Sequence, residues 1–144
     1  KEALKALGVI AGILIIGIGI SLGGSLGKSS RHQGTQKIMN EVNSKLPMMV
    51  DDQTRVDKIH IDRKKNVVTY TITLVNVSAF DFNRDEFDIY SKRLSEDAKQ
   101  RNLSKVCALP FVMKEPRFNV TYQYLGKDGL GLGYFTVSPA ECRD

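Results

Sequence analysis

Residues Ala6–Leu22 constrain the fold most strongly, because this stretch carries no charged side chain. It lies between Lys5 and a basic cluster that begins at Lys28. An α-helix of about this length crosses a hydrocarbon layer of about 30 Å, where every backbone polar group needs a partner within the helix. The sequence therefore predicts a transmembrane anchor helix at residues 1–27 and a domain held at a membrane surface.

A cleaved secretory signal peptide is the alternative interpretation of this segment. Lys1 and Lys5 would form its basic region, and the small residues near Ser25 and Gly27 would form its cleavage site. The length of the apolar stretch and the residues that flank it favour a retained anchor.

Glycines recur along the predicted anchor helix at a spacing of four residues. Gly8 and Gly12 form a GxxxG pair, and Gly19 and Gly23 repeat the spacing. Small residues allow two helix backbones to approach closely, although glycine is common in membrane helices in general. The spacing favours packing against another helix, either in an integral membrane partner or in a second copy of this chain.

Basic residues follow the predicted span and form a juxtamembrane linker at residues 28–37. Lys28, Arg31 and Lys37 are expected to contact anionic lipid headgroups. The whole chain has a formal net charge of +5. It shows no basic face with interleaved aromatic residues, which nucleic-acid binding requires, so membrane lipids rather than nucleic acid are the predicted partners of these charges.

Residues 38–144 are enough for a single domain with one modest core. Apolar residues repeat every three to four positions from Ile38 to Met49, which predicts a helix that Pro47 should end or bend. Strict alternation then predicts two β-hairpins, with tight turns at Lys64-Lys65-Asn66 and Lys127-Asp128-Gly129. Their strands are expected at residues 55–62, 67–77, 118–124 and 130–138.

A second helix is predicted between the two hairpins. Asn83 is its expected N-cap and Glu86 completes a capping box. Its apolar stripe is formed by Phe87, Tyr90, Leu94 and Ala98. A separate short helical piece is expected after it, at residues 104–109. We therefore expect an α+β fold in which the anchor helix precedes a two-layer domain of order α-β-β-α-β-β with a four-stranded antiparallel sheet.

The thiols of the chain are Cys107 and Cys142. They are too far apart for CxxC redox chemistry, and neither has a metal-ligand spacing with His32 or His60. In an oxidising compartment they predict one disulfide, whereas two buried free thiols in a reducing compartment are the alternative. The disulfide interpretation places residues 38–144 in the periplasm and the N-terminus in the cytoplasm.

No pattern in the chain predicts catalysis. His60 lies between Ile59 and Ile61, so its ring should point away from the face that they share. Gly27-Lys28-Ser29 resembles the end of a phosphate-binding loop, but Leu22 occupies the position of the first glycine. The alternating Gly129, Gly131 and Gly133 do not form a GxGxxG phosphate-binding loop either, and are more typical of close packing in a strand. We therefore expect no enzyme and no catalytic, cofactor-binding or metal-binding residues.

Four stretches together resemble small envelope proteins of bacteria that have no assigned activity. They are NSKLPMMV at Asn43–Val50, the threonine-rich VVTYTITLVNVS, the helix end at Val106-Cys107, and the tyrosine-rich hairpin before Cys142. The resemblance implies a secreted or periplasm-facing α+β domain with an export or anchor segment and a disulfide. It implies no catalytic residues.

A second resemblance is to type IV pilin-like subunits, which combine an apolar N-terminal helix with a β-rich head and a C-terminal disulfide loop. Those families begin on a Phe-like residue with Glu at the fifth position, whereas this chain has Lys1, Glu2 and Lys5.

The function that the sequence favours is that of a single-pass protein of the bacterial inner membrane. Its periplasmic domain would mediate protein–protein interaction as an accessory or structural subunit, with a pilin-like filament subunit as the alternative and a small envelope enzyme least favoured.

Overall fold

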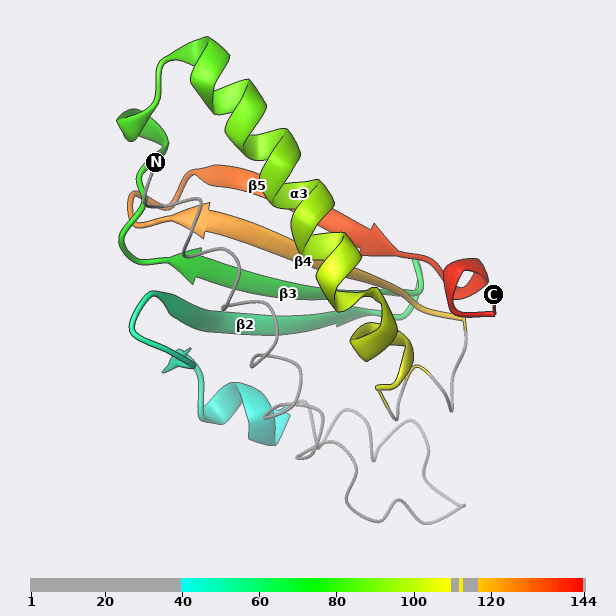
Figure 1. Ribbon diagram of the computed structural model, residues 1–144. Helices are drawn as coiled ribbons and strands as arrows, with labels where there is room; N and C mark the ends of the chain where they lie inside the picture. Colours follow the sequence, from blue (N-terminus) through cyan, green and yellow to red (C-terminus); the bar gives the residue numbers. More distant parts are fainter. Residues whose placement is uncertain (1–39, 110–111, 113–116, 144) are drawn as a thin grey trace, which may run out of the picture.

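The computed structural model describes residues 40–109, 112 and 117–143. One five-stranded mixed sheet has the strand order β1-β2-β3-β4-β5, and helix α3 lies diagonally across one of its faces (Figure 1). The elements are β1 (Met48–Met49), β2 (Thr54–Asp62), β3 (Val67–Leu74), η1 (Ala79–Asp81), α3 (Arg84–Cys107), β4 (Asn119–Gly126), β5 (Gly131–Val137) and η2 (Pro139–Cys142).

Both predicted hairpins are confirmed. β2 pairs with β3 and β4 pairs with β5, each pair antiparallel. Asn66 in the first turn has φ of 54°, and Gly129 in the second has φ of 79°, the left-handed conformation for which Asn and Gly are suited. The alternation of apolar residues therefore identified the strands and turns correctly.

The predicted antiparallel sheet of order α-β-β-α-β-β is wrong. β3 and β4 are parallel neighbours, with Val67 opposite Asn119, and the sheet has five strands. The reason is the length of α3, which has 24 residues and continues without a break into the predicted separate piece, ending at Cys107. Such a helix is about 36 Å long, enough to return the chain along the whole length of a strand of about 26 Å. The next strand therefore starts at the same end of the sheet as β3.

The first predicted helix ends earlier than the sequence suggested. Residues 40–44 are helical, and the chain then turns at Pro47 into β1. Met49, which was expected on the helix, pairs with Arg55 of β2 instead. Beyond this short edge strand, the side chain of Asn43 substitutes for a strand: its amide donates to the Ile59 carbonyl at 2.8 Å and accepts from the Ile59 N–H at 3.0 Å.

The predicted anchor and its flanking residues lie outside the described residues. These include Gly8, Gly12, Gly19, Gly23, Lys28, Arg31 and Lys37. Among the helices of the described part of the chain, none combines the length and the apolar character that crossing a membrane requires.

The core lies between α3 and the sheet. Tyr90, Leu94 and Ala98 are buried on α3 at a spacing of four residues, as the predicted stripe requires, and Asn102 and Val106 extend the same line. On the sheet, Tyr70, Tyr122 and Phe135 stack in sequence across three strands, with ring centroids 4.6 and 4.9 Å apart. This aromatic row joins the two hairpins across the parallel β3–β4 boundary.

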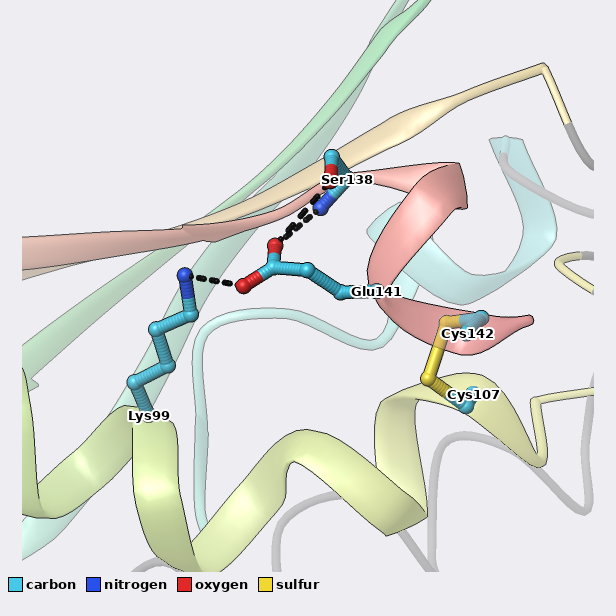
Figure 2. Close-up of a disulfide and its surroundings, with 5 residues drawn as sticks. All are labelled: Lys99, Cys107, Ser138, Glu141 and Cys142. Carbon is cyan, nitrogen blue, oxygen red and sulfur yellow. Dashed lines mark hydrogen bonds and ion pairs between the residues drawn. A yellow bond between two sulfur atoms is a disulfide. The ribbon is translucent and has the colours of Figure 1, made fainter. Parts of the chain in front are cut away.

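The predicted disulfide is present and fixes the end of the chain to the end of α3 (Figure 2). The Cα atoms of Cys107 and Cys142 are 5.2 Å apart. About two helical turns before Cys107, Lys99 Nζ lies 2.6 Å from Glu141 Oε1, and Glu141 also accepts from the Ser138 N–H at 2.8 Å. Its hydrogen bonds, first of all that from Lys99, hold the pKa of Glu141 below its usual value.

Candidate protein-binding groove

An apolar groove runs beside β5, at the side of the sheet where α3 begins. It consists of two open hollows of about 500 and 340 Å³, which adjoin because both are lined by Phe87 and Gly131. The larger hollow also reaches polar side chains of the neighbouring strands, Thr69 of β3 and Thr121 and Gln123 of β4. Three large side chains along the groove are solvent-exposed: Phe80 by 81%, Tyr134 by 66% and Leu130 by 46%. We call this feature the β5 groove.

Phe80 is exposed on a turn that the structure holds in place. The Ser78 side chain caps η1, and Asp81 accepts from the Ser78 N–H at 2.8 Å, completing a capping box. From the β4–β5 turn, Asp128 accepts from the Ser78 hydroxyl at 2.5 Å and from the Ala79 N–H at 2.8 Å. These bonds hold the pKa of Asp128 below its usual value, with the Ser78 hydroxyl contributing most. Phe80 is therefore preorganised rather than carried on a loose loop.

Aromatic side chains form one wall of the groove. Phe82 stacks on Tyr90 of α3 at 4.5 Å between ring centroids, and it meets Phe87 edge-on at 6.4 Å. Burial raises the pKa of Tyr90 to about 12, so its hydroxyl stays protonated at neutral pH. These rings fix the N-terminal turns of α3 against the segment that presents Phe80.

Glycine allows α3 to close over the edge of β5. A Cβ atom at Gly133 would lie 2.8 Å from Ser95 Oγ and 3.2 Å from the Ser91 carbonyl oxygen. The Ser95 hydroxyl, which donates to the Ser91 carbonyl, accepts from the Tyr134 N–H at 3.1 Å. The predicted close packing at this glycine run is therefore confirmed at Gly133. Because one edge N–H of β5 is already bonded, α3 obstructs the addition of a further strand here.

His60 lies away from the groove. It is exposed on β2, as its place between two isoleucines predicts, and does not line either hollow. Tyr70 and Tyr122 are buried elsewhere, and burial raises the pKa of both phenols above the usual value. Within residues 40–109, 112 and 117–143, no three His, Cys, Asp or Glu side chains converge as a metal site would require.

The sequence prediction did not identify the groove, although two signals point to it. Ser78-Ala-Phe-Asp81 and Asn83-Arg-Asp-Glu86 are two consecutive capping boxes, and both form. Together the two boxes fix the backbone from Ser78 to Glu86, with Phe80 inside the first box and Phe82 between the two. The turn that presents an exposed aromatic residue was therefore encoded locally.

Comparison with known proteins bears on the fold. No protein-family model matches this sequence, and a search of curated proteins finds no relative. Two solved structures are similar. A protein of Pseudomonas aeruginosa that is inferred to be secreted has 10% identity and a TM-score of 0.57, covering 75% of this chain and 88% of its own. A pilotin of the Vibrio vulnificus type 2 secretion system, EpsS, has 14% identity and a TM-score of 0.51, covering 75% of this chain and 87% of its own.

These likenesses establish a shared fold at low sequence identity. The expected likeness to small envelope proteins agrees with them in part, since one neighbour is inferred to be secreted and the other is a pilotin of a secretion system. Neither neighbour is a pilin. The chain therefore adopts the fold seen in a pilotin and in a small protein inferred to be secreted.

Proposed function

We propose that this chain is an accessory subunit of a bacterial cell-envelope assembly, and that its β5 groove binds an apolar segment of a partner protein without catalysing a reaction. The exposure of Phe80 carries the proposal. Burying one such side chain stabilises a complex by about 1.5–3 kcal/mol, and Phe80 is already held in place, so binding requires little ordering of this residue.

The shape of the groove favours a protein segment over a small molecule. Both hollows are open, and the exposed side chains stand along them rather than closing over them. Small ligands are bound in pockets that bury most of their surface. Because α3 already bonds the edge of β5 at Tyr134, the segment is recognised through its apolar side chains and not by adding a strand.

The envelope location is part of the same proposal. A disulfide is typical of an oxidising compartment, which supports a periplasmic domain behind the predicted inner-membrane anchor. The pilotin among the structural neighbours belongs to a secretion system, which supports a secretion-type assembly as the setting. The partner that we propose is a membrane protein of that assembly.

Site-specific photocrosslinking in the native host tests this function. A photoreactive phenylalanine at position 80 or 134 of the full chain should crosslink to one and the same protein, and Leu130→Asp should abolish both products. Ile89, which is 56% exposed on α3 but lines neither hollow, provides the matched control position, and Ile89→Asp the matched control variant. Equal crosslinking from position 89, or products that survive Leu130→Asp, would refute binding in the groove.

A further inference from the structure

One end of the sheet collects three segments that are distant in sequence. Val67, the first residue of β3, is opposite both Asp62 of β2 and Asn119 of β4. Val137, the last residue of β5, pairs with Val120 beside it. The disulfide adds the C-terminal end of α3 and the end of the chain to this group (Figure 1). The β2–β3 turn, the start of β4 and both disulfide-linked ends therefore lie together.

Basic residues gather at this end, which we call the basic end. Asp62 is engaged there by the N–H groups of Lys64 and Lys65, each at 3.0 Å, and Glu141 is paired with Lys99. The ammonium groups of both turn lysines project from an exposed turn. The described basic residues of this end are Arg63, Lys64, Lys65, Lys105, Arg117 and Arg143.

The opposite end of the sheet has the opposite character. It carries the exposed Phe80 and Leu130 of the β5 groove. Its described charged residues are mainly acidic: Asp51, Asp52, Asp81, Asp85, Glu86 and Asp128. The basic ones are Arg84, Lys127 and Arg55, and Arg55 forms an ion pair with Asp57. Charge is therefore separated along the strand direction, and the part of the groove that carries Phe80 and Leu130 lies at the acidic end.

We propose that the basic end binds anionic phospholipid headgroups and so orients the domain with its β5 groove away from the bilayer. Each Lys or Arg close to an anionic membrane strengthens binding about fivefold. The large hydrophobic side chains that are exposed in the described part of the chain are Met48, Met49, Phe80, Ile89, Leu130 and Tyr134, and none belongs to the segments of the basic end. A protein interface normally has an apolar or aromatic centre, whereas headgroup binding needs charge alone.

The predicted anchor fits this orientation. Residues 28–39 extend to at most about 40 Å, so a span at residues 1–27 would hold the domain within that distance of headgroups. The proposal concerns the folded domain, and it is separate from the juxtamembrane residues Lys28, Arg31 and Lys37. It also does not depend on what the β5 groove binds.

Lysine footprinting of the full chain tests the proposal. The protein is reconstituted in vesicles of phosphatidylcholine alone or of phosphatidylcholine mixed with phosphatidylglycerol, and a membrane-impermeant acylating reagent is followed by mass spectrometry. Acylation of Lys64 and Lys65, relative to Lys127 at the acidic end, should be at least about fivefold slower in the anionic vesicles. High salt should remove this protection, because ions screen contacts at a membrane surface.

Paired variants identify the contact. In the anionic vesicles Lys105 should also be protected from acylation. The double variant Lys64→Glu, Lys65→Glu should abolish this protection of Lys105, whereas Lys127→Glu should leave it unchanged. Equal acylation in both kinds of vesicle would overturn the proposal. So would protection that appears only in native membranes that contain other proteins, because the basic end would then bind an acidic protein and not lipid.

Discussion

Replacing Gly133 by alanine tests whether α3 is docked on β5 as closely as the structure shows. The added Cβ would lie 2.8 Å from Ser95 Oγ and 3.2 Å from the Ser91 carbonyl oxygen. Ser95 could move only by giving up its bonds to that carbonyl and to the Tyr134 N–H. The Ser91 carbonyl is part of the helix backbone, so the rest of the contact has to be relieved by a shift of α3 itself.

The expected cost follows from these two effects. Each weakened hydrogen bond costs about 0.5–1.5 kcal/mol, and overpacking of a tight contact costs about 1–3 kcal/mol. We expect Gly133→Ala to lower the free energy of unfolding by about 2–6 kcal/mol in total. Gly131→Ala is the matched control on the same strand, because a Cβ there meets nothing within 4 Å. It should be neutral or stabilising by up to about 1 kcal/mol.

Urea unfolding of the two variants and the parent, followed by circular dichroism, measures the difference. A third variant, Ser95→Ala with Gly133→Ala, should recover part of the loss because the shortest contact disappears, although the Tyr134 N–H stays unpaired. If Gly133→Ala is as stable as Gly131→Ala, then α3 does not lie against β5 at the distance described. The obstruction of the strand edge would then also be wrong.

Three further predictions concern the disulfide, a carboxylate and a turn. Replacing Cys107 and Cys142 by serine opens a loop with a sequence separation of 35 and should cost about 3–4 kcal/mol, and reductant should destabilise the parent equally but leave the variant unchanged. Because the folded pKa of Asp128 is lowered, its contribution to stability is present above the unfolded value near 4 and is lost as pH falls below it. Asp128→Asn should therefore unfold with less dependence on pH between about 5 and 2 than the parent, and an unchanged slope would contradict this. Asn66→Ala should cost about 1–2 kcal/mol because of its positive φ, whereas Asn66→Gly should be tolerated; equal stability of the two in thermal unfolding would contradict the turn geometry.

Local features of this fold could be predicted from the sequence, whereas the pairing between them could not. Alternation identified both hairpins, and Asn83 with Glu86 identified the start of α3. The same alternation fits a parallel or an antiparallel neighbour, so it could not decide whether β3 and β4 run in the same direction or in opposite directions. That choice depended on the length of α3, which runs through Asn102 into the segment that was predicted as a separate short helix. In the structure Asn102 is buried, with its amide donating to the Ala98 carbonyl at 2.7 Å.

The β5 groove was harder to predict than the fold because it depends on exposure. The two capping boxes around Phe80 predict the turn that carries it, but they do not distinguish a phenylalanine that packs inside from one that stays exposed. The difference arises from Asp128, which lies 50 residues away from Ser78 in sequence and bonds to it in space. The two turns that meet there are separately predictable, but their contact is not.

The parallel pairing of β3 with β4 also has a consequence for the order in which the molecule folds. The first hairpin needs only neighbouring residues, but the free edge of β3 has to wait for a strand whose first residue, Asn119, comes long after Val67. Until then VVTYTITL is an unpaired edge rich in β-branched residues, the kind of segment that recruits other unfolded chains. During synthesis, which starts at the N-terminus, the chain is therefore most prone to aggregate after α3 has been made and before β4 has been made. Conditions or chaperones that shield β3 should raise the yield of folded protein more than any that act after the disulfide has closed.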